Sequence, residues 1–185
     1  DGRSVILKGK EPIRTKTLIW AAGIKGSFIE GLSSEVNNRS NRLIVDEYHL
    51  IKGYKNIYAI GDIACMITEK TPKGHPQVAQ VAIQSARNLA NNFKLIQKGK
   101  SAKVFKYRDL GTMATVGRNK AVVDLKLFNF QGFFAWFIWM FIHLRSIFGV
   151  KNKILVLINW MWSYITYDQS LRLTFLPKNF RLTKK

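Results

Sequence analysis

The sequence predicts an α/β domain followed by a helical, aromatic C-terminal region. The first part holds short apolar runs typical of strands, and a stretch from about Pro76 to Phe93 whose apolar residues recur at helical spacing. The second part holds two long, almost wholly apolar runs. The predicted strands lie at 3–8, 17–21, 42–46 and 56–60, and the apolar runs at 133–144 and 154–167.

The predicted strands are separated by turn residues. A polar turn containing Pro12 joins the first two, and Gly23 and Gly26 then interrupt the chain. The run at 56–60 ends at Gly61–Asp62. Glycines and alternating apolar residues in 103–126 predict two more short strands and a turn.

The helix predicted over 76–93 begins near a proline, which is favoured in a first helical turn. Its apolar residues share one face, whereas Gln80 and Gln84 lie one turn apart on another, together with Arg87, Asn88 and Asn91. The simpler interpretation is a solvated face. The alternative is that the free N–H groups at Pro76–Ala79 stabilise an anionic group and that the glutamines bind a carbonyl ligand.

The charge balance points to a polyanionic partner. The chain has 30 Lys and Arg against 11 Asp and Glu, a net charge of +19, and 47% hydrophobic residues, which excludes general disorder. Most Phe and all Trp but Trp20 follow residue 127, in apolar runs beside basic residues. This arrangement is typical of a membrane-surface binder rather than a nucleic-acid binder, which intersperses single aromatic residues with basic ones.

The aromatic block 128–167 has two interpretations, a buried helical hairpin or a surface that lies on a membrane. Neither apolar run reaches the ~20 residues that a membrane-crossing helix needs. Two apolar helices broken by the basic cluster 151–153, in a strongly basic chain, favour the membrane surface. The single cysteine, Cys65, excludes an intrachain disulfide and indicates a cytosol-facing protein.

Two short motifs have the form of strand ends at a ligand site. In YAIGD (58–62), the glycine lets a ligand approach the backbone, and Asp62 can accept hydrogen bonds from sugar or polyol hydroxyls. In WAAG (20–23), small residues leave room for a flat ligand. On these residues alone, the simpler interpretation is favoured: a strand followed by a turn for YAIGD, and close packing for WAAG. The three histidines are too scattered for a metal site, and no G-x-G-x-x-G or Walker motif occurs.

Taken in order, WAAG, YAIGD, AQVAIQ (79–84), MATVGRNKAV (113–122) and the aromatic C-terminus resemble the second half of the type II NADH dehydrogenases. This family consists of single-subunit, FAD-dependent NADH:quinone oxidoreductases that do not pump protons. The resemblance implies the C-terminal part of a flavoprotein with two Rossmann-like dinucleotide-binding domains, followed by an amphipathic helical membrane anchor. It implies the end of an NADH-binding domain at 1–24, part of an FAD-binding domain at 25–102, and a quinone-site and anchoring region at 103–185.

The resemblance also assigns site residues, none of them a catalytic acid or base. It implies FAD contacts at Gly61, Asp62, Ala79 and Gln80, NADH contacts at Ala22 and Gly23, and quinone contacts at Gln80, Gln84 and Lys120. The sequence opens without the N-terminal glycine-rich motifs of the family. We therefore expect a fragment that binds FAD poorly by itself.

The partners implied are quinone and an anionic membrane surface, which residues 128–185 would contact, with a homodimer also allowed and no nucleic acid. The implied location is peripheral, on the cytoplasmic face of a bacterial inner membrane. Two alternatives stay open. One is a non-catalytic, basic, aromatic membrane-binding module, and the other is a soluble disulfide reductase of the same superfamily, against which the aromatic tail argues.

Overall fold

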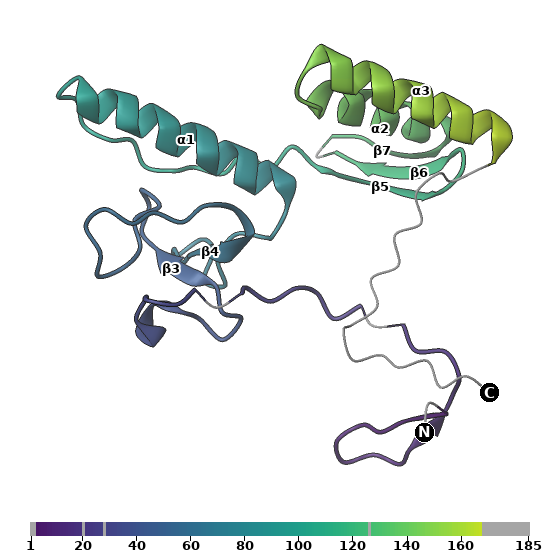
Figure 1. Cartoon of the computed structure of the whole chain (residues 1–185), viewed down its shortest axis with the longest axis horizontal. Helices are drawn as coiled ribbons and strands as arrows, with labels where there is room; N and C mark the ends of the chain where they lie inside the picture. Colours follow the sequence, from purple (N-terminus) through teal and green to yellow (C-terminus); the bar gives the residue numbers. More distant parts are fainter. Residues whose placement is uncertain (1–2, 20, 28, 126, 168–185) are drawn as a thin grey trace. The chain divides into compact units, whose positions relative to one another are not determined.

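The computed structural model describes residues 3–19, 21–27, 29–125 and 127–167. Trp20 of the WAAG motif and residues 168–185 of the expected anchoring region lie outside this range. The chain forms two compact units, 1–109 and 110–185, which we describe separately (Figure 1). Both combine helices with strands, which confirms the mixed α/β composition. The functional division at residues 24 and 102 stays a prediction.

The first unit opens with a short antiparallel pair, β1 (Ser4–Val5) and β2 (Ile13–Arg14). The strand expected at 17–21 is wrong, because no described residue of that segment is in a strand. Thr15 provides a local reason. Its hydroxyl donates to the carbonyl of Thr17 and accepts from the Thr17 N–H, so these groups are satisfied within the loop.

A parallel pair forms the centre of the first unit: β3 (Leu43–Val45) lies beside β4 (Ala64–Met66), with Leu43 opposite Ala64. The strand predicted at 42–46 is confirmed. The one predicted at 56–60 is not, because only Tyr58 forms a bridge there, to Leu50. The short helices η1 (Ser34–Val36) and η2 (Gly61–Ile63) precede β3 and β4 respectively.

Helix α1 (Ala79–Gln97) confirms the predicted helix but begins at Ala79 rather than near Pro76. The preceding residue, Val78, is extended, with φ −134° and ψ 150°. The side-chain amide of Gln77 donates to the carbonyl of Asp62, which ties the segment before the helix to η2. This tie accompanies the later start of the helix.

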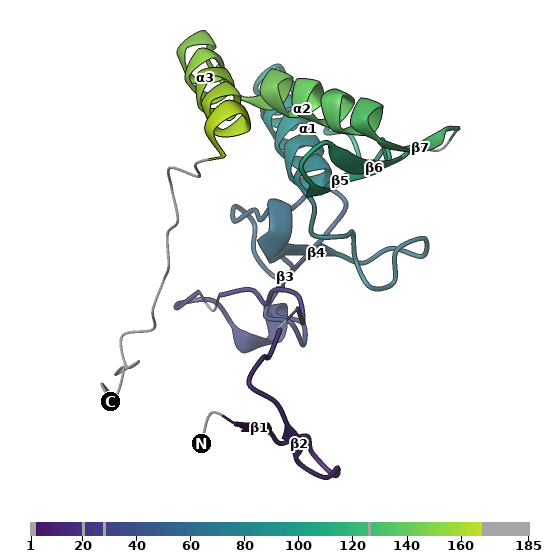
Figure 2. The same ribbon diagram turned by 90° about the vertical axis from the view of Figure 1, so that its right-hand side faces the viewer.

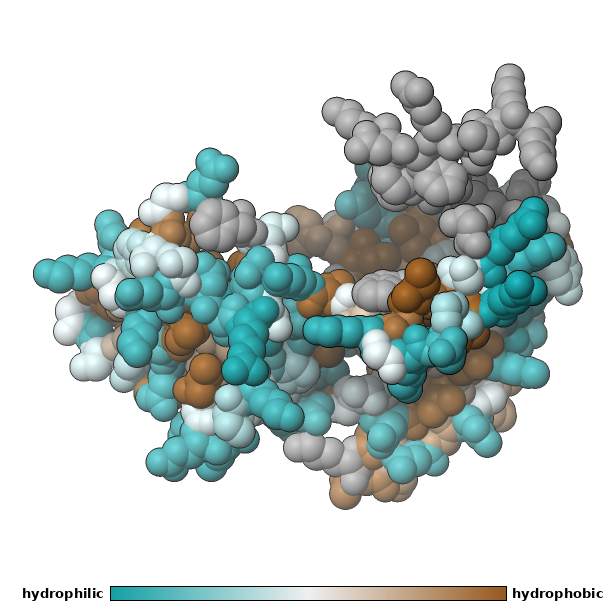
Figure 3. All heavy atoms as spheres, turned by 90° about the horizontal axis from the view of Figure 1, so that it is seen from below, coloured by the Kyte–Doolittle hydropathy of each residue, from teal (hydrophilic) through white to brown (hydrophobic). Residues whose placement is uncertain are grey.

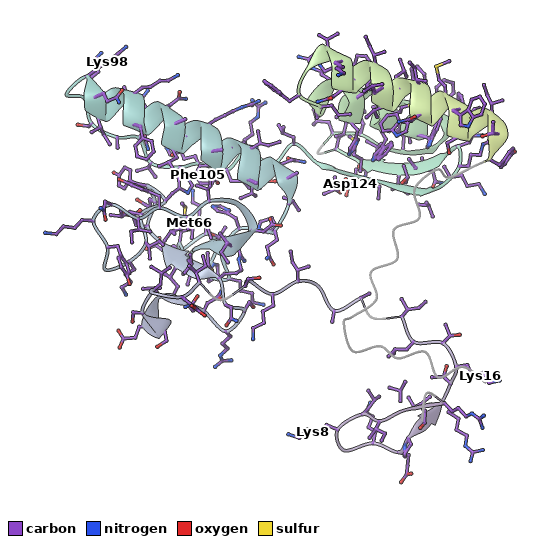
Figure 4. All side chains as sticks on the ribbon, in the orientation of Figure 1. Lys8, Lys16, Met66, Lys98, Phe105 and Asp124 are labelled. Carbon is purple, nitrogen blue, oxygen red and sulfur yellow. The ribbon has the colours of Figure 1, made fainter. Side chains whose placement is uncertain are left out.

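The core of the first unit lies between α1 and the β3–β4 pair, where Met66 and Phe105 are buried (Figure 4). Two histidines flank the Phe105 ring, His49 at 4.8 Å and His75 at 5.5 Å between ring centroids. Arg42 is also buried, and its Nη2 donates to the carbonyls of Ala64 and His75. A buried cation therefore fastens β4 to the loop before α1.

The second unit begins with a three-stranded antiparallel sheet: β5 (Thr112–Gly117), β6 (Lys120–Asp124) and β7 (Asn129–Gly132). The sequence predicted two strands in this region. The third strand, β7, was not predicted, and its Phe130 packs into the same core. Burial alternates along β6, where Ala121 and Val123 are buried against the helix that follows.

Two helices complete this unit, α2 (Phe133–Ser146) and α3 (Val150–Thr166), and they coincide with the two predicted apolar runs. Helix α2 lies along one face of the sheet and buries Ala135 (Figures 1 and 2). Helix α3 contacts α2 through rings, including Trp139 with Trp160. Within the described residues, no helix is long and apolar enough to cross a membrane.

Replacing Arg42 with Met should lower the free energy of unfolding by about 2–4 kcal/mol, because two buried carbonyls lose a charged donor. Denaturant titration measures the loss. Arg39→Met, at an exposed position in the same loop, is the matched control and should change stability by less than ~0.5 kcal/mol. Equal stability of the two variants would contradict the fastening role.

Stability should fall as the pH drops below about 6.5. Burial lowers the pKa of both His49 and His75 from the ordinary value of 6.5. At His49, the charge of Asp46 opposes this shift and the charge of His75 adds to it. At His75, the charge of Arg42 lowers the pKa further. Below pH 6.5 the two histidines therefore bind protons more readily in the unfolded chain than in the folded chain. The free energy of unfolding that they contribute is fully present above pH 6.5 and is lost as the pH falls toward their folded-state pKa values.

The measurement is the free energy of unfolding between pH 5 and 8, compared with a His49→Asn/His75→Gln double variant. That variant should be less stable at pH 8 but should lose less stability on acidification. The same pH slope in both proteins would show that other groups cause the acid sensitivity.

Candidate functional site

The candidate site in the first unit is the corner where η2 packs against the start of α1. Gly61 has φ +72°, a left-handed conformation that favours glycine, and a Cβ placed on it would lie 3.5 Å from the Cβ of Ala82. Asp62 follows and is exposed. Within the described chain its carboxylate makes no hydrogen bond, whereas its backbone carbonyl accepts from Gln77. The corner thus presents a rigid backbone and an available carboxylate.

This corner fits the group that the resemblance implies. FAD carries hydroxyls, which can donate hydrogen bonds to a carboxylate. It also carries a flavin ring, whose anionic reduced form is stabilised by the positive end of a helix. Asp62 supplies the acceptor, and Ala79, exposed in the first turn of α1, lies at that positive end. The residues present therefore match the chemistry of the donor and acceptor set.

The two predicted glutamines project from α1 toward the extended segment 103–109, which forms no strand. Gln84 exchanges two hydrogen bonds with the backbone of Arg108: its Nε2 donates to the carbonyl at 2.8 Å, and its Oε1 accepts from the N–H at 3.0 Å. Gln80 also contacts this segment, since its Oε1 accepts from the Tyr107 hydroxyl at 3.5 Å. Neither glutamine belongs to a merely solvated face.

Sequence reasoning missed Asn92, which continues the row of amides along α1. Its Oδ1 accepts from the Lys103 N–H at 2.8 Å, and its Nδ2 donates to the Lys103 carbonyl at 2.9 Å. Asn88 also donates to that carbonyl, at 3.3 Å. The available signal was the spacing of four residues between Gln80, Gln84, Asn88 and Asn92, which places these amides along one line of a helix.

Tyr107 stands beside this row and is half-buried. Its ring lies 5.5 Å from that of His75, and burial together with the charge and hydrogen bond of Asp109 raises the pKa of its hydroxyl. The hydroxyl is protonated at neutral pH, as an ordinary tyrosine is, and it lies next to Gln80.

The structure does not bring the predicted NADH residues to this corner. Ala22 and Gly23 are exposed in a segment without strand or helix, and no described side chain would meet a Cβ at Gly23 within 4 Å. Their assignment rests on the resemblance alone.

In the second unit, Lys120 begins β6 and is exposed. The structure draws attention to Arg118 in the same turn, which sequence reasoning missed. Its guanidinium stacks on the rings of Tyr164 and Tyr167, at 4.1 and 3.9 Å, and donates to the Tyr164 carbonyl. A cation thereby binds the C-terminal end of α3, where the helix dipole favours positive charge.

An apolar cavity of about 790 Å³ lies within this unit, between the two helices and the β5–β6 turn. Aromatic rings dominate its wall, including Trp136, Trp139 and Trp160, and Arg118 lines its edge. Elsewhere on the molecule, hydrophobic side chains also reach the surface in patches bordered by hydrophilic ones (Figure 3).

Two family models match this chain in succession. Residues 1–86 match the pyridine nucleotide-disulphide oxidoreductases, and residues 110–166 match the NDH2 C-terminal domain. The second match begins where the second compact unit begins.

Similar proteins carry consistent names. The chain is 33% identical over 166 residues to the type II NADH:quinone oxidoreductase NdhA of Mycobacterium tuberculosis, covering 85% of this chain and 34% of that protein. It is 32% identical to the internal alternative NAD(P)H-ubiquinone oxidoreductase A1 of Arabidopsis thaliana mitochondria, covering 80% of this chain and 32% of that protein. The chain thus spans about a third of the length of these relatives.

The fold has a solved counterpart. The structure of NDH2 from Plasmodium falciparum in complex with NADH superposes with a TM-score of 0.68 at 19% identity, over 85% of this chain and 46% of that one. The two successive family matches, the named relatives and this shared fold agree with the motifs described above. The chain belongs to the type II NADH dehydrogenases.

Proposed function

We propose that this chain forms the quinone-side and membrane-side part of a flavin-dependent NADH:quinone oxidoreductase. The observation that carries the proposal is the corner of Gly61, Asp62 and the first turn of α1, with Gln80 and Gln84 following on the same helix. The names of the relatives support this reaction. Because they are about three times as long, the activity belongs to the complete protein rather than to these 185 residues alone.

Four residues would hold the cofactor, FAD, which supplies the redox chemistry when it is bound. Asp62 would accept hydrogen bonds from its hydroxyls, and Gly61 would allow the close approach that a Cβ in a left-handed conformation hinders. Ala79 and Gln80 would meet the flavin ring at the positive end of α1. Ala22 and Gly23 would lie on the nicotinamide side.

The resemblance assigns quinone to Gln80 and Gln84 in the first unit and to Lys120 in the second unit. A quinone headgroup offers two carbonyl acceptors, which side-chain amide and ammonium groups satisfy as donors. Tyr107 adds a protonated hydroxyl beside Gln80. None of these groups needs to act as an acid or base, so their contribution would be binding and orientation.

The second unit would rest on an anionic membrane surface, from which a hydrophobic quinone can arrive. The turn between α2 and α3 supports this role, since Phe148 is 93% exposed and is flanked by Arg145 and Lys151. Exposed rings next to cations are typical of segments that lie in the headgroup region. We place the protein peripherally on the cytoplasmic face of a bacterial inner membrane, with a homodimer as the proposed assembly.

The proposal requires that the complete protein purify yellow and reduce quinone with NADH. In that protein, Gln80→Met should raise the quinone KM about 5- to 10-fold per bound flavin, because one hydrogen bond is lost. Gln97→Met, at the exposed end of the same helix, is the control and should leave the KM unchanged. An unchanged KM in Gln80→Met would remove this residue from the quinone site.

The membrane role predicts that Phe148→Ser weakens binding to vesicles of anionic phospholipid about tenfold. The reason is that the variant lacks an aromatic ring that would transfer from water into the membrane. Flotation of protein with vesicles measures the bound fraction. Val116→Ser is the control, because Val116 is also exposed but lies on β5. Equal flotation of both variants would contradict insertion of the α2–α3 turn. Vesicle binding by a complete protein that lacks quinone reduction would instead favour the non-catalytic membrane module.

A further inference from the structure

The row of amides on α1 forms hydrogen bonds with the backbone of the segment 103–109, as a neighbouring strand does in a sheet. The segment 103–109 is extended but belongs to no sheet, and most of its residues are exposed or half-buried. Its Phe105 N–H donates to the carbonyl of Glu47, on one side of the segment. On the other side, the polar backbone groups of Lys103 and Arg108 are satisfied by side chains of the helix.

The two pairings have the same form. A carboxamide has one donor and one acceptor side by side, as a residue in a strand has its N–H and C=O. Gln84 uses both on Arg108, and Asn92 uses both on Lys103, at distances of 2.8–3.0 Å. The segment is thus clamped near each end, which fixes its register on the helix.

The register decides where two rings lie. Between the clamps the side chains alternate, so that Phe105 is buried between the two histidines and Tyr107 is half-buried next to Gln80. A slip by one residue would turn these rings outward. The Arg108 clamp is adjacent to Tyr107 and so controls the position of its hydroxyl.

A direct quinone contact by Gln84 would break this clamp. Both polar atoms of its amide are engaged with Arg108, and turning the amide toward a ligand would leave the Arg108 N–H and carbonyl without their partners. Gln80 lies in the first turn of α1 and contacts a side chain rather than the backbone of this segment, since its Oε1 accepts from the Tyr107 hydroxyl. The two glutamines of one motif therefore have different surroundings.

We propose that Gln84 is a positioning residue, which holds Arg108 and through it Tyr107 beside Gln80, rather than a direct ligand of quinone. Asn92 performs the same clamping on Lys103, away from the start of the helix. The inference deepens the proposed function and rests on it for the link to quinone. The clamp itself rests on the hydrogen bonds alone.

Amide hydrogen exchange at single residues of the complete protein tests the clamp. In Gln84→Met, exchange of the Arg108 N–H should accelerate at least tenfold, because its acceptor is gone. In Gln84→Glu at pH 7–8, one carboxylate oxygen still accepts from this N–H, but the other cannot donate to the Arg108 carbonyl, so exchange should accelerate less than in Gln84→Met. Asn92→Leu should accelerate exchange at Lys103, whereas Asn91→Leu, at the exposed neighbouring position, should not.

The quinone assay tests the link to the site. Gln84→Met should lower kcat/KM for quinone together with faster exchange at Arg108, and Gln84→Glu should be intermediate in both. Unchanged exchange at Arg108 in Gln84→Met overturns the clamp. An unchanged kcat/KM for quinone in Gln84→Met, despite faster exchange at Arg108, overturns the positioning role. Absence of quinone reduction in the parent protein refutes the proposed function, while the exchange result still decides the clamp.

Discussion

The paired hydrogen bonds between α1 and the segment 103–109 are the constraint on which the first unit depends. A chain that leaves a helix and returns along it without a strand partner must satisfy its backbone polar groups in another way. Gln84 and Asn92 provide this by presenting a donor and an acceptor together. With these bonds in place, Phe105 enters the core between His49 and His75. Without them, the backbone N–H and C=O groups of Lys103 and Arg108 would lose these partners.

The same helix links this constraint to the candidate cofactor corner. Its first turn packs against the residue with the left-handed backbone, Gly61, and the segment before it is tied to Asp62 through Gln77. Arg42 fastens the loop before the helix to β4 from within the core. One helix therefore carries the proposed flavin contact at its start and the proposed quinone contact within its first turn, and it is braced at both places by side chains that bond to backbone.

The pattern of apolar residues in the sequence predicted several elements correctly. Helical spacing predicted α1, the two long apolar runs predicted α2 and α3, and the alternation in 42–46 predicted β3. It failed at 17–21, where apolar residues suggested a strand but Thr15 satisfies the backbone locally. It also could not reveal that Arg42 is buried or that Asn92 binds Lys103, because both depend on carbonyl and amide groups brought close only by the fold. The glutamine pair was recognised by resemblance to the family, whereas the difference between its two members required the contacts.

A structure of the complete protein with a quinone bound would test the central claim most directly, through the position of the Gln84 amide. The account predicts that both bonds to Arg108, 2.8 and 3.0 Å here, persist with quinone present, and that the quinone carbonyl lies within hydrogen-bonding distance of Gln80. A structure in which Gln84 has turned from Arg108 and donates to the quinone would contradict it.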